Sequence, residues 1–142
     1  MRLTRYSDFA MRVLLYLGSR PGELSSIAEI ARAYAISKDH LMKVVNDLVN
    51  AGYLESVRGR YGGIRLARPA AEINIGAVLR HTEEDFDLVG CGECLIARGC
   101  GLTSVLDEAL DAFLGILDRY SLADVLARKG DFRHLLVAAG AA

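Results

Sequence analysis

Apolar residues recur every three to four positions near the start of the chain, which is the spacing of one face of a helix. A first helix is predicted over residues 9–17, where the apolar side chains are Phe9, Val13, Leu14 and Leu17. Pro21 and Gly22 follow it, a pair that is typical of a chain leaving a helix and turning. The chain therefore opens with one amphipathic helix and a turn.

A helix, a short turn and a second helix are predicted next. Ser26 and Glu29 are spaced as a capping box, because the serine oxygen can cap a free backbone N–H while the glutamate reaches back. They predict the start of a helix over residues 27–33. After a turn, a helix over residues 38–50 ends before Gly52, a typical C-terminal stop. Its inward-facing side chains are Leu41, Val44, Val45 and Leu48.

Two short strands follow, and glycine and arginine dominate the segment between them. Residues 53–57 alternate as a strand, and residues 64–66 predict a second one. Residues 58–63 (RGRYGG) then form a flexible, positively charged hairpin tip. Helix, turn, helix and basic hairpin, in this order, are the arrangement of a winged helix-turn-helix.

That arrangement suits duplex DNA. The second helix of such a unit fits the major groove, where its first residues reach base edges, and a basic wing tip suits phosphates or a narrow minor groove. Asp39 is either a base reader or a partner of the helix dipole. The residues predicted to contact DNA are Ser37, Lys38, His40, Lys43, Arg58, Arg60 and Tyr61.

The second half of the chain is helical around one glycine-rich loop. Asn74 can cap a helix over residues 75–82, and the cysteine segment after it is predicted to be a loop. A long helix is predicted over residues 104–120, opened by a capping box from Ser104 to Asp107. Ser121 and Asp124 cap a last short helix. The predicted fold is thus mainly α with a small β-wing.

Charge divides the chain in two. Residues 1–70 hold eleven lysines and arginines against six aspartates and glutamates, a net of +5, whereas residues 71–142 hold six against twelve, a net of −6. A basic front half indicates a module that faces a polyanion. We expect three parts: a DNA-binding unit over 1–70, a connecting helix and cysteine loop over 71–103, and a long helix with the tail over 104–142.

Length and composition exclude several classes of protein. The 142 residues suit one compact domain, and 52% apolar residues are ordinary for a globular chain. No apolar stretch approaches the roughly 18 residues that span a bilayer, and the first residues lack the apolar core of a signal peptide. We expect a cytoplasmic protein that does not bind membranes.

Three cysteines, Cys91, Cys94 and Cys100, lie within ten residues. An odd number on one loop of a cytosolic chain points to metal or redox chemistry rather than a disulfide framework. Three soft thiolates suit an iron–sulfur cluster or zinc, for which His81 could be a fourth ligand. A dithiol switch between Cys91 and Cys94 also fits the spacing. Spacing alone does not choose among these.

These residues resemble the Rrf family of winged-helix repressors that carry iron–sulfur clusters. The resemblance runs from residue 1 to about residue 126. It is closest in residues 57–66 (VRGRYGGIRL), and it includes residues 51–54 (AGYL), the cysteine loop and residues 120–124 (YSLAD). The gap between Cys91 and Cys94 is shorter than is usual in the family, which leaves the cluster type open.

The resemblance implies a homodimer joined by the long helix, and a cluster held by Cys91, Cys94 and Cys100. It also implies that an aspartate from the other subunit, here Asp8, supplies a fourth ligand in the nitric-oxide-sensing branch; a helix cap is the other interpretation of Asp8. A 4Fe-4S cluster is expected ahead of a 2Fe-2S one. The family's cluster-loaded form binds a palindromic operator, and nitrosylation or loss of the cluster releases it.

Other functions remain open at this point. Within the family, an iron-responsive (RirA-like) or redox-responsive regulator fits the same stretches, and so does a winged-helix regulator based on zinc or thiols. A thiol oxidoreductase using Cys91 and Cys94 is disfavoured, because no βαβ pattern surrounds the pair and no nucleophile stands beside a base. A dimeric scaffold whose wing binds protein is the third class. We expect a regulator and not an enzyme.

Overall fold

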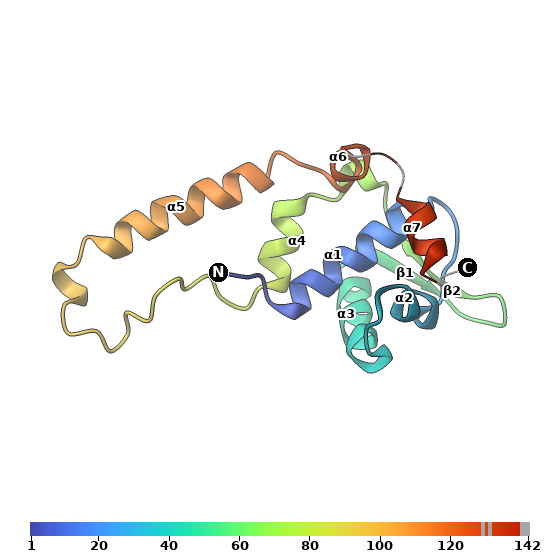
Figure 1. The fold of residues 1–142 in the computed structure, drawn as a ribbon, viewed down its shortest axis with the longest axis horizontal. Helices are drawn as coiled ribbons and strands as arrows, with labels where there is room; N and C mark the ends of the chain where they lie inside the picture. Colours follow the sequence, from blue (N-terminus) through green and yellow to red (C-terminus); the bar gives the residue numbers. More distant parts are fainter. Residues whose placement is uncertain (129, 131, 140–142) are drawn as a thin grey trace.

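The computed structural model describes residues 1–128, 130 and 132–139. A body of helices carries a two-stranded hairpin, and one long helix, α5, extends away from that body (Figure 1). Short 3-10 turns lie at Ala70–Glu72 and Ala97–Gly99. The helices and strands are α1 (Arg5–Gly18), α2 (Ile27–Tyr34), α3 (Lys38–Asn50), β1 (Leu54–Val57), β2 (Gly63–Leu66), α4 (Ile75–Thr82), α5 (Leu102–Leu117), α6 (Leu122–Ala127) and α7 (Arg133–Ala138).

The helix-turn-helix is confirmed. The Ser26–Glu29 capping box is formed at the start of α2, with both hydrogen bonds 3.1 Å long. Helix α3 begins and ends where the sequence predicts, and Gly52 follows it in the left-handed region, at a φ of +83°. The four apolar side chains predicted to face inward from α3 are buried: Leu41, Val44, Val45 and Leu48.

Helix α1 begins four residues earlier than the apolar pattern predicts. Thr4 is its N-cap, and the threonine oxygen accepts a hydrogen bond from the backbone N–H of Ser7 at 3.2 Å. The extra turn is polar on its outer side, so hydrophobic spacing does not reveal it, whereas a cap residue does. The helix ends at Gly18, and Pro21 and Gly22 follow it in the connecting turn.

The wing is an antiparallel hairpin in which Leu54 lies opposite Leu66 and Val57 opposite Gly63. Its base is joined to the helix-turn-helix, because Ile64 bridges to Ser25 just before α2. A Cβ at residue 63 would lie 2.8 Å from the carbonyl oxygen of Ser25, so the close approach of the two backbones requires glycine there. The wing is thus held firmly at its base.

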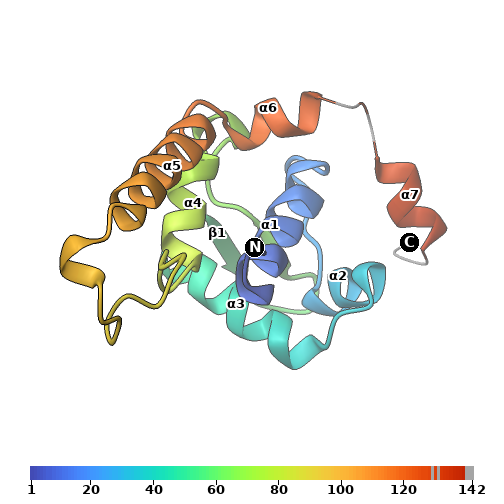
Figure 2. The same ribbon diagram turned by 60° about the vertical axis from the view of Figure 1, so that its left-hand side comes forward.

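The hydrophobic core crosses the expected boundary at residue 70. It combines side chains of α1, α2, α3 and the hairpin with Ile73, Ile75 and Leu122 from the second half of the chain. The backbone N–H of Leu122 donates to the carbonyl of Ile73 at 2.8 Å, and that of Ile75 donates to Tyr120 at 3.0 Å. The C-terminal segment therefore returns from α5 to pack on α1, as Figure 2 shows for α6.

Two expectations about α5 are wrong. The helix runs from Leu102 to Leu117 rather than over 104–120, and Ser104 forms no capping box, because its hydroxyl donates to the carbonyl of Gly101. The helix stops early because residues 120–122 leave it to pair with residues 73–75. In contrast, the predicted caps at Asn74 and Ser121 are both formed.

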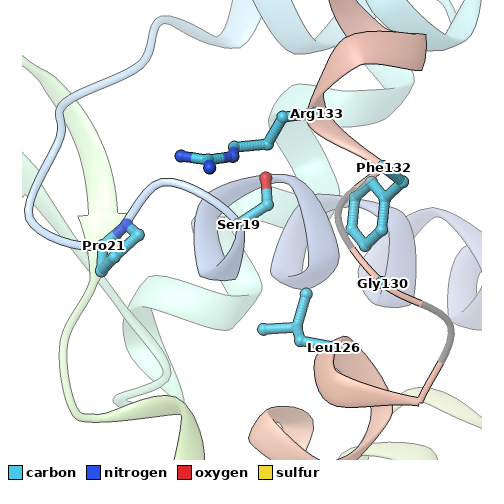
Figure 3. A pocket seen from close by; sticks show the side chains of 6 residues that line it. All are labelled: Ser19, Pro21, Leu126, Gly130, Phe132 and Arg133. Atoms are coloured by element: carbon cyan, nitrogen blue, oxygen red, sulfur yellow. The ribbon is translucent and has the colours of Figure 1, made fainter.

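The C-terminal tail contains α7, which the sequence did not predict; Leu136 of this helix is buried in the core. Residues 131 and 140–142 of the tail lie outside the described residues. A pocket of about 410 Å³ separates the end of α1 from the segment around α7. Figure 3 shows its lining: Ser19, Pro21, Leu126, Gly130, Phe132 and Arg133.

Candidate DNA interface and cysteine loop

Helix α3 has two faces of opposite character. Its apolar face is buried in the core, and the polar side chains predicted to contact DNA, Ser37, Lys38, His40 and Lys43, are all exposed. Ser37 precedes the helix without making a side-chain capping bond, so its hydroxyl stays available. In the described part of the chain, neither lysine is held in an ion pair. The exposed face therefore presents donors and positive charge.

The tip of the wing is also exposed and basic. Arg58, Arg60 and Tyr61 project from the turn between the strands, and Tyr61 is 84% exposed. The guanidinium of Arg60 lies 5.7 Å from the centre of the Tyr61 ring, close enough for a cation–π contact. Figure 1 shows α3 and the hairpin on the part of the body away from α5. Two basic elements are thus available to one duplex.

The cysteine loop connects α4 to α5. Cys91 and Cys100 are partly buried, Cys94 is exposed, and all three are free thiols. The sulfur of Cys91 lies 3.4 Å from the hydroxyl of Thr103 at the start of α5. Over residues 1–128, 130 and 132–139, no group of three His, Cys, Asp or Glu side chains is arranged to hold a metal ion.

The three cysteines are nonetheless the type of ligand that an iron–sulfur cluster needs. Three reduced thiols on one short segment are the ligands that iron–sulfur clusters use. Added Cβ atoms at Gly90, Gly92, Gly99 and Gly101 would meet nothing within 4 Å, so no side chains are packed against the loop at these positions. Cys91, Cys94 and Cys100 are the residues that could hold such a group.

Asp8 lies in the first turn of α1 and is not its N-cap, a role taken by Thr4. Its carboxylate accepts hydrogen bonds from Arg12, with 3.0 Å between Oδ2 and Nη2. The capping interpretation of Asp8 is therefore wrong. Within one chain Asp8 has a partner other than the cysteines.

Among the described residues, His81 is not grouped with the cysteines as a zinc ligand, which was one possibility left open by the sequence. Its Nε2 lies 2.9 Å from Oδ2 of Asp47 on α3, and the same oxygen accepts a hydrogen bond of 2.7 Å from the hydroxyl of Tyr6 on α1. We call Tyr6, Asp47 and His81 the Asp47 cluster. Burial, and then the bond to Asp47, raise the pKa of Tyr6 to about 12. Sequence reasoning missed this cluster, because no spacing relates three residues on three helices.

The N-terminus of α1 is tied to the end of α4, where the cysteine loop begins. The backbone N–H of Thr4 donates to Glu83 at 2.8 Å, and the hydroxyl of Ser7 donates to Thr82 at 2.8 Å. Burial raises the pKa of Glu83, but the hydrogen bonds from Ser7 and Thr4 outweigh it, and the pKa lies below its ordinary value.

Fold and surface together define a winged helix-turn-helix transcriptional regulator. The family model described as "Iron-dependent Transcriptional regulator", Rrf2, matches residues 3–128. The chain belongs to the Rrf2 family. Like its relatives, it is a DNA-binding transcriptional regulator and not an enzyme.

The comparisons with individual proteins agree. The chain is 51% identical to the HTH-type transcriptional regulator NsrR of Bacillus subtilis, over 96% of this chain and 97% of that protein. A transcriptional regulator of Listeria innocua has a similar structure, with a TM-score of 0.77 and 26% identity, over 92% of this chain and 90% of that one. The oxidized form of Staphylococcus aureus CymR matches with a TM-score of 0.76 and 26% identity, over 92% and 99%.

Among the helices that the structure describes, none has the length and apolar character needed to cross a bilayer.

Proposed function

We propose that this chain is a homodimeric repressor whose binding to a palindromic operator is controlled by an iron–sulfur cluster that senses nitric oxide. The observation that carries the proposal is the loop of three free thiols, which joins α4 of the DNA-binding body directly to the projecting helix α5. Similarity to proteins named NsrR supports it. Such a repressor works in the cytoplasm, where its operator is.

The DNA contacts are assigned to α3 and the wing. Ser37, Lys38, His40 and Lys43 would meet base edges and phosphates in the major groove, while the wing-tip residues Arg58, Arg60 and Tyr61 would lie along the neighbouring groove. All seven side chains are exposed in the free protein. In a dimer two such surfaces are related by a two-fold axis, which requires a palindromic site.

Dimerisation is assigned to α5. Its side chains Leu102, Val105, Phe113 and Ile116 are 54%, 60%, 38% and 52% exposed, although the helix is apolar. Large apolar side chains that gather exposed on one helix are unfavourable in water and are typical of an interface. Packing two α5 helices together would cover these apolar side chains and place one DNA-binding body on each side of the helix pair.

The cluster is assigned to Cys91, Cys94 and Cys100, with Asp8 of the second protomer as the fourth ligand. When bound, the cluster supplies iron that reacts with nitric oxide. We favour 4Fe-4S over 2Fe-2S. To act as this ligand, the carboxylate of Asp8 would leave its ion pair with Arg12 and bind the cluster on the partner's cysteine loop. This bond would tie α1 of one protomer to the loop of the other. Losing the tie changes the spacing of the two α3 helices, on which specific affinity depends.

We assign three parts to the chain: residues 1–70 bind DNA, residues 71–103 connect and hold the cluster, and residues 104–142 contain the dimerisation helix α5 and a tail that packs back on the DNA-binding body. The second candidate is an iron-responsive regulator, since "iron-dependent" is the description of the family. In that case removal of iron alone would relieve repression. A redox-responsive or zinc-based regulator would use the same three thiols.

The test is anaerobic purification with iron and sulfide analysis, followed by titration with nitric oxide while absorbance and DNA binding are recorded. We expect a brown protein whose spectrum and operator affinity fall together. A colourless, zinc-loaded protein that still binds DNA would contradict the sensor. Release from DNA by an iron chelator, with no effect of nitric oxide, would establish the iron-responsive alternative.

A further inference from the structure

The Asp47 cluster joins three helices at one oxygen atom. Oδ2 of Asp47, on the DNA-facing helix α3, accepts hydrogen bonds from Tyr6 on α1 at 2.7 Å and from His81 on α4 at 2.9 Å. The side chains of His81 and Asp47 are 36% and 35% exposed, so the pair is not part of the dry core. These directional bonds add to the shared hydrophobic core in fixing the position of α3 relative to α4.

The wing is connected to the same histidine. The ring of Tyr53, which immediately precedes β1, packs edge-on against His81 with 6.2 Å between ring centres. Arg68, just after β2, places its guanidinium 4.6 Å from the centre of the same tyrosine ring. The backbone of Tyr53 also donates to Leu48 at the end of α3. His81 therefore touches both DNA-reading elements, α3 through Asp47 and the wing through Tyr53.

The cysteine loop starts directly beyond this histidine. The next two residues, Thr82 and Glu83, are held by Ser7 and Thr4 at the start of α1. A rearrangement of the loop that pulls on the end of α4 thus acts first on these bonds and on His81. Among the described residues, no other side chain of α4 has a hydrogen bond or ion pair to α3. Arg80, the residue before His81, pairs instead with Asp118 just after α5.

We propose that His81 is a positioning residue for DNA recognition, which couples the cysteine loop to α3 through Asp47 and to the wing through Tyr53. The inference rests on the proposed function, because it requires that the state of the loop controls operator binding. His81 does not touch DNA or the cluster ligands in this role. It keeps α3 and the wing in one fixed relation to the end of α4.

The experiment compares His81→Ala, His81→Gln and the wild type. The probe is a duplex selected from a random library by the cluster-loaded wild type, and a scrambled duplex of the same length serves as the non-specific probe. Affinity for both is measured by fluorescence anisotropy for cluster-loaded and cluster-free protein at one salt concentration. Hydrogen exchange of α3 amides in the cluster-free protein supplies a readout that is independent of the cluster. His134→Ala, an exposed histidine on α7, is the matched control.

We expect His81→Ala to reduce the ratio of cluster-loaded to cluster-free affinity by about fivefold. Its affinity for the scrambled duplex should be unchanged, and exchange in α3 should be faster. His81→Gln keeps an N–H near the position of Nε2 and should restore most of the ratio, while His134→Ala should match the wild type.

Three results would overturn the proposal: an unchanged ratio in His81→Ala, an equal loss of affinity for the scrambled duplex, or a His81→Gln variant no better than His81→Ala. The proposed function fails in a different way. If the wild type binds the selected duplex equally well with and without its cluster, the sensor claim itself is contradicted, whatever the His81 variants do.

Discussion

The carboxylate of Asp8 and the guanidinium of Arg12 form an ion pair one helical turn apart on α1, with 3.0 Å between Oδ2 and Nη2. Their side chains are 45% and 41% exposed. An exposed pair at this spacing contributes only about 0.3–0.5 kcal/mol. Breaking the ion pair between Asp8 and Arg12 therefore costs little free energy. A carboxylate that is to bind a cluster in the partner subunit has to meet this requirement.

Replacing Asp8 by alanine should separate stability from sensing. We expect Asp8→Ala to change the free energy of unfolding by no more than about 0.5 kcal/mol. Operator affinity of the cluster-loaded protein and its response to nitric oxide should both fall, as measured by anisotropy. Arg12→Ala removes the same ion pair but keeps the carboxylate, so it should retain the response. An Asp8→Ala protein that keeps both properties would contradict the assignment of Asp8.

Lys43 on the exposed face of α3 should act through its charge. A lysine that meets a phosphate releases about one counterion, so Lys43→Ala should lower affinity for every duplex and reduce the slope of log affinity against log salt by about 1. Arg128→Ala, just after α6, is the control, because Arg128 contacts Tyr120 and lies outside the proposed DNA interface. Equal salt slopes for Lys43→Ala and the wild type would exclude Lys43 from the phosphate contacts.

The exposed apolar face of α5 predicts a charge-sensitive dimer. Ile116 is 52% exposed, and a glutamate there would place a charge in the proposed interface. We expect Ile116→Glu to sediment with half the mass of the wild type. Val125→Glu introduces the same charge at an exposed apolar position on α6 and should remain dimeric. A dimeric Ile116→Glu protein would place the interface elsewhere.

Glu83 predicts a pH-dependent contribution to stability. Because its pKa is lowered on folding, the contribution is present above the ordinary carboxyl pKa and is lost as pH falls through the lower value of the folded state. Glu83→Ala should cost about 1 kcal/mol at neutral pH, the usual worth of such bonds. In denaturant titrations the difference should shrink in acid. Exposed Glu84 is the control, and a pH-independent effect of Glu83→Ala would argue against the ionised bonds.

The sequence predicts local structure well where one strong signal defines it. Helix α3 is predicted to the residue, because its apolar face and the following glycine agree. In α1 the polar first turn carries no hydrophobic signal, so its start at Arg5 was missed although Thr4 is a good cap. In α5 the apolar pattern continues past Leu117, but pairing between residues 120–122 and 73–75 ends the helix.

The sequence by itself determined the order of elements, the polar face of α3, the basic wing tip and the clustered cysteines. These depend on periodicity, caps and turns, which neighbouring residues specify. Only the tertiary structure decided that Tyr6, Asp47 and His81 meet at one oxygen, and that the segment around Leu122 completes the core. The physical reason is that such contacts join residues far apart in the chain, and their geometry exists only after the helices have packed.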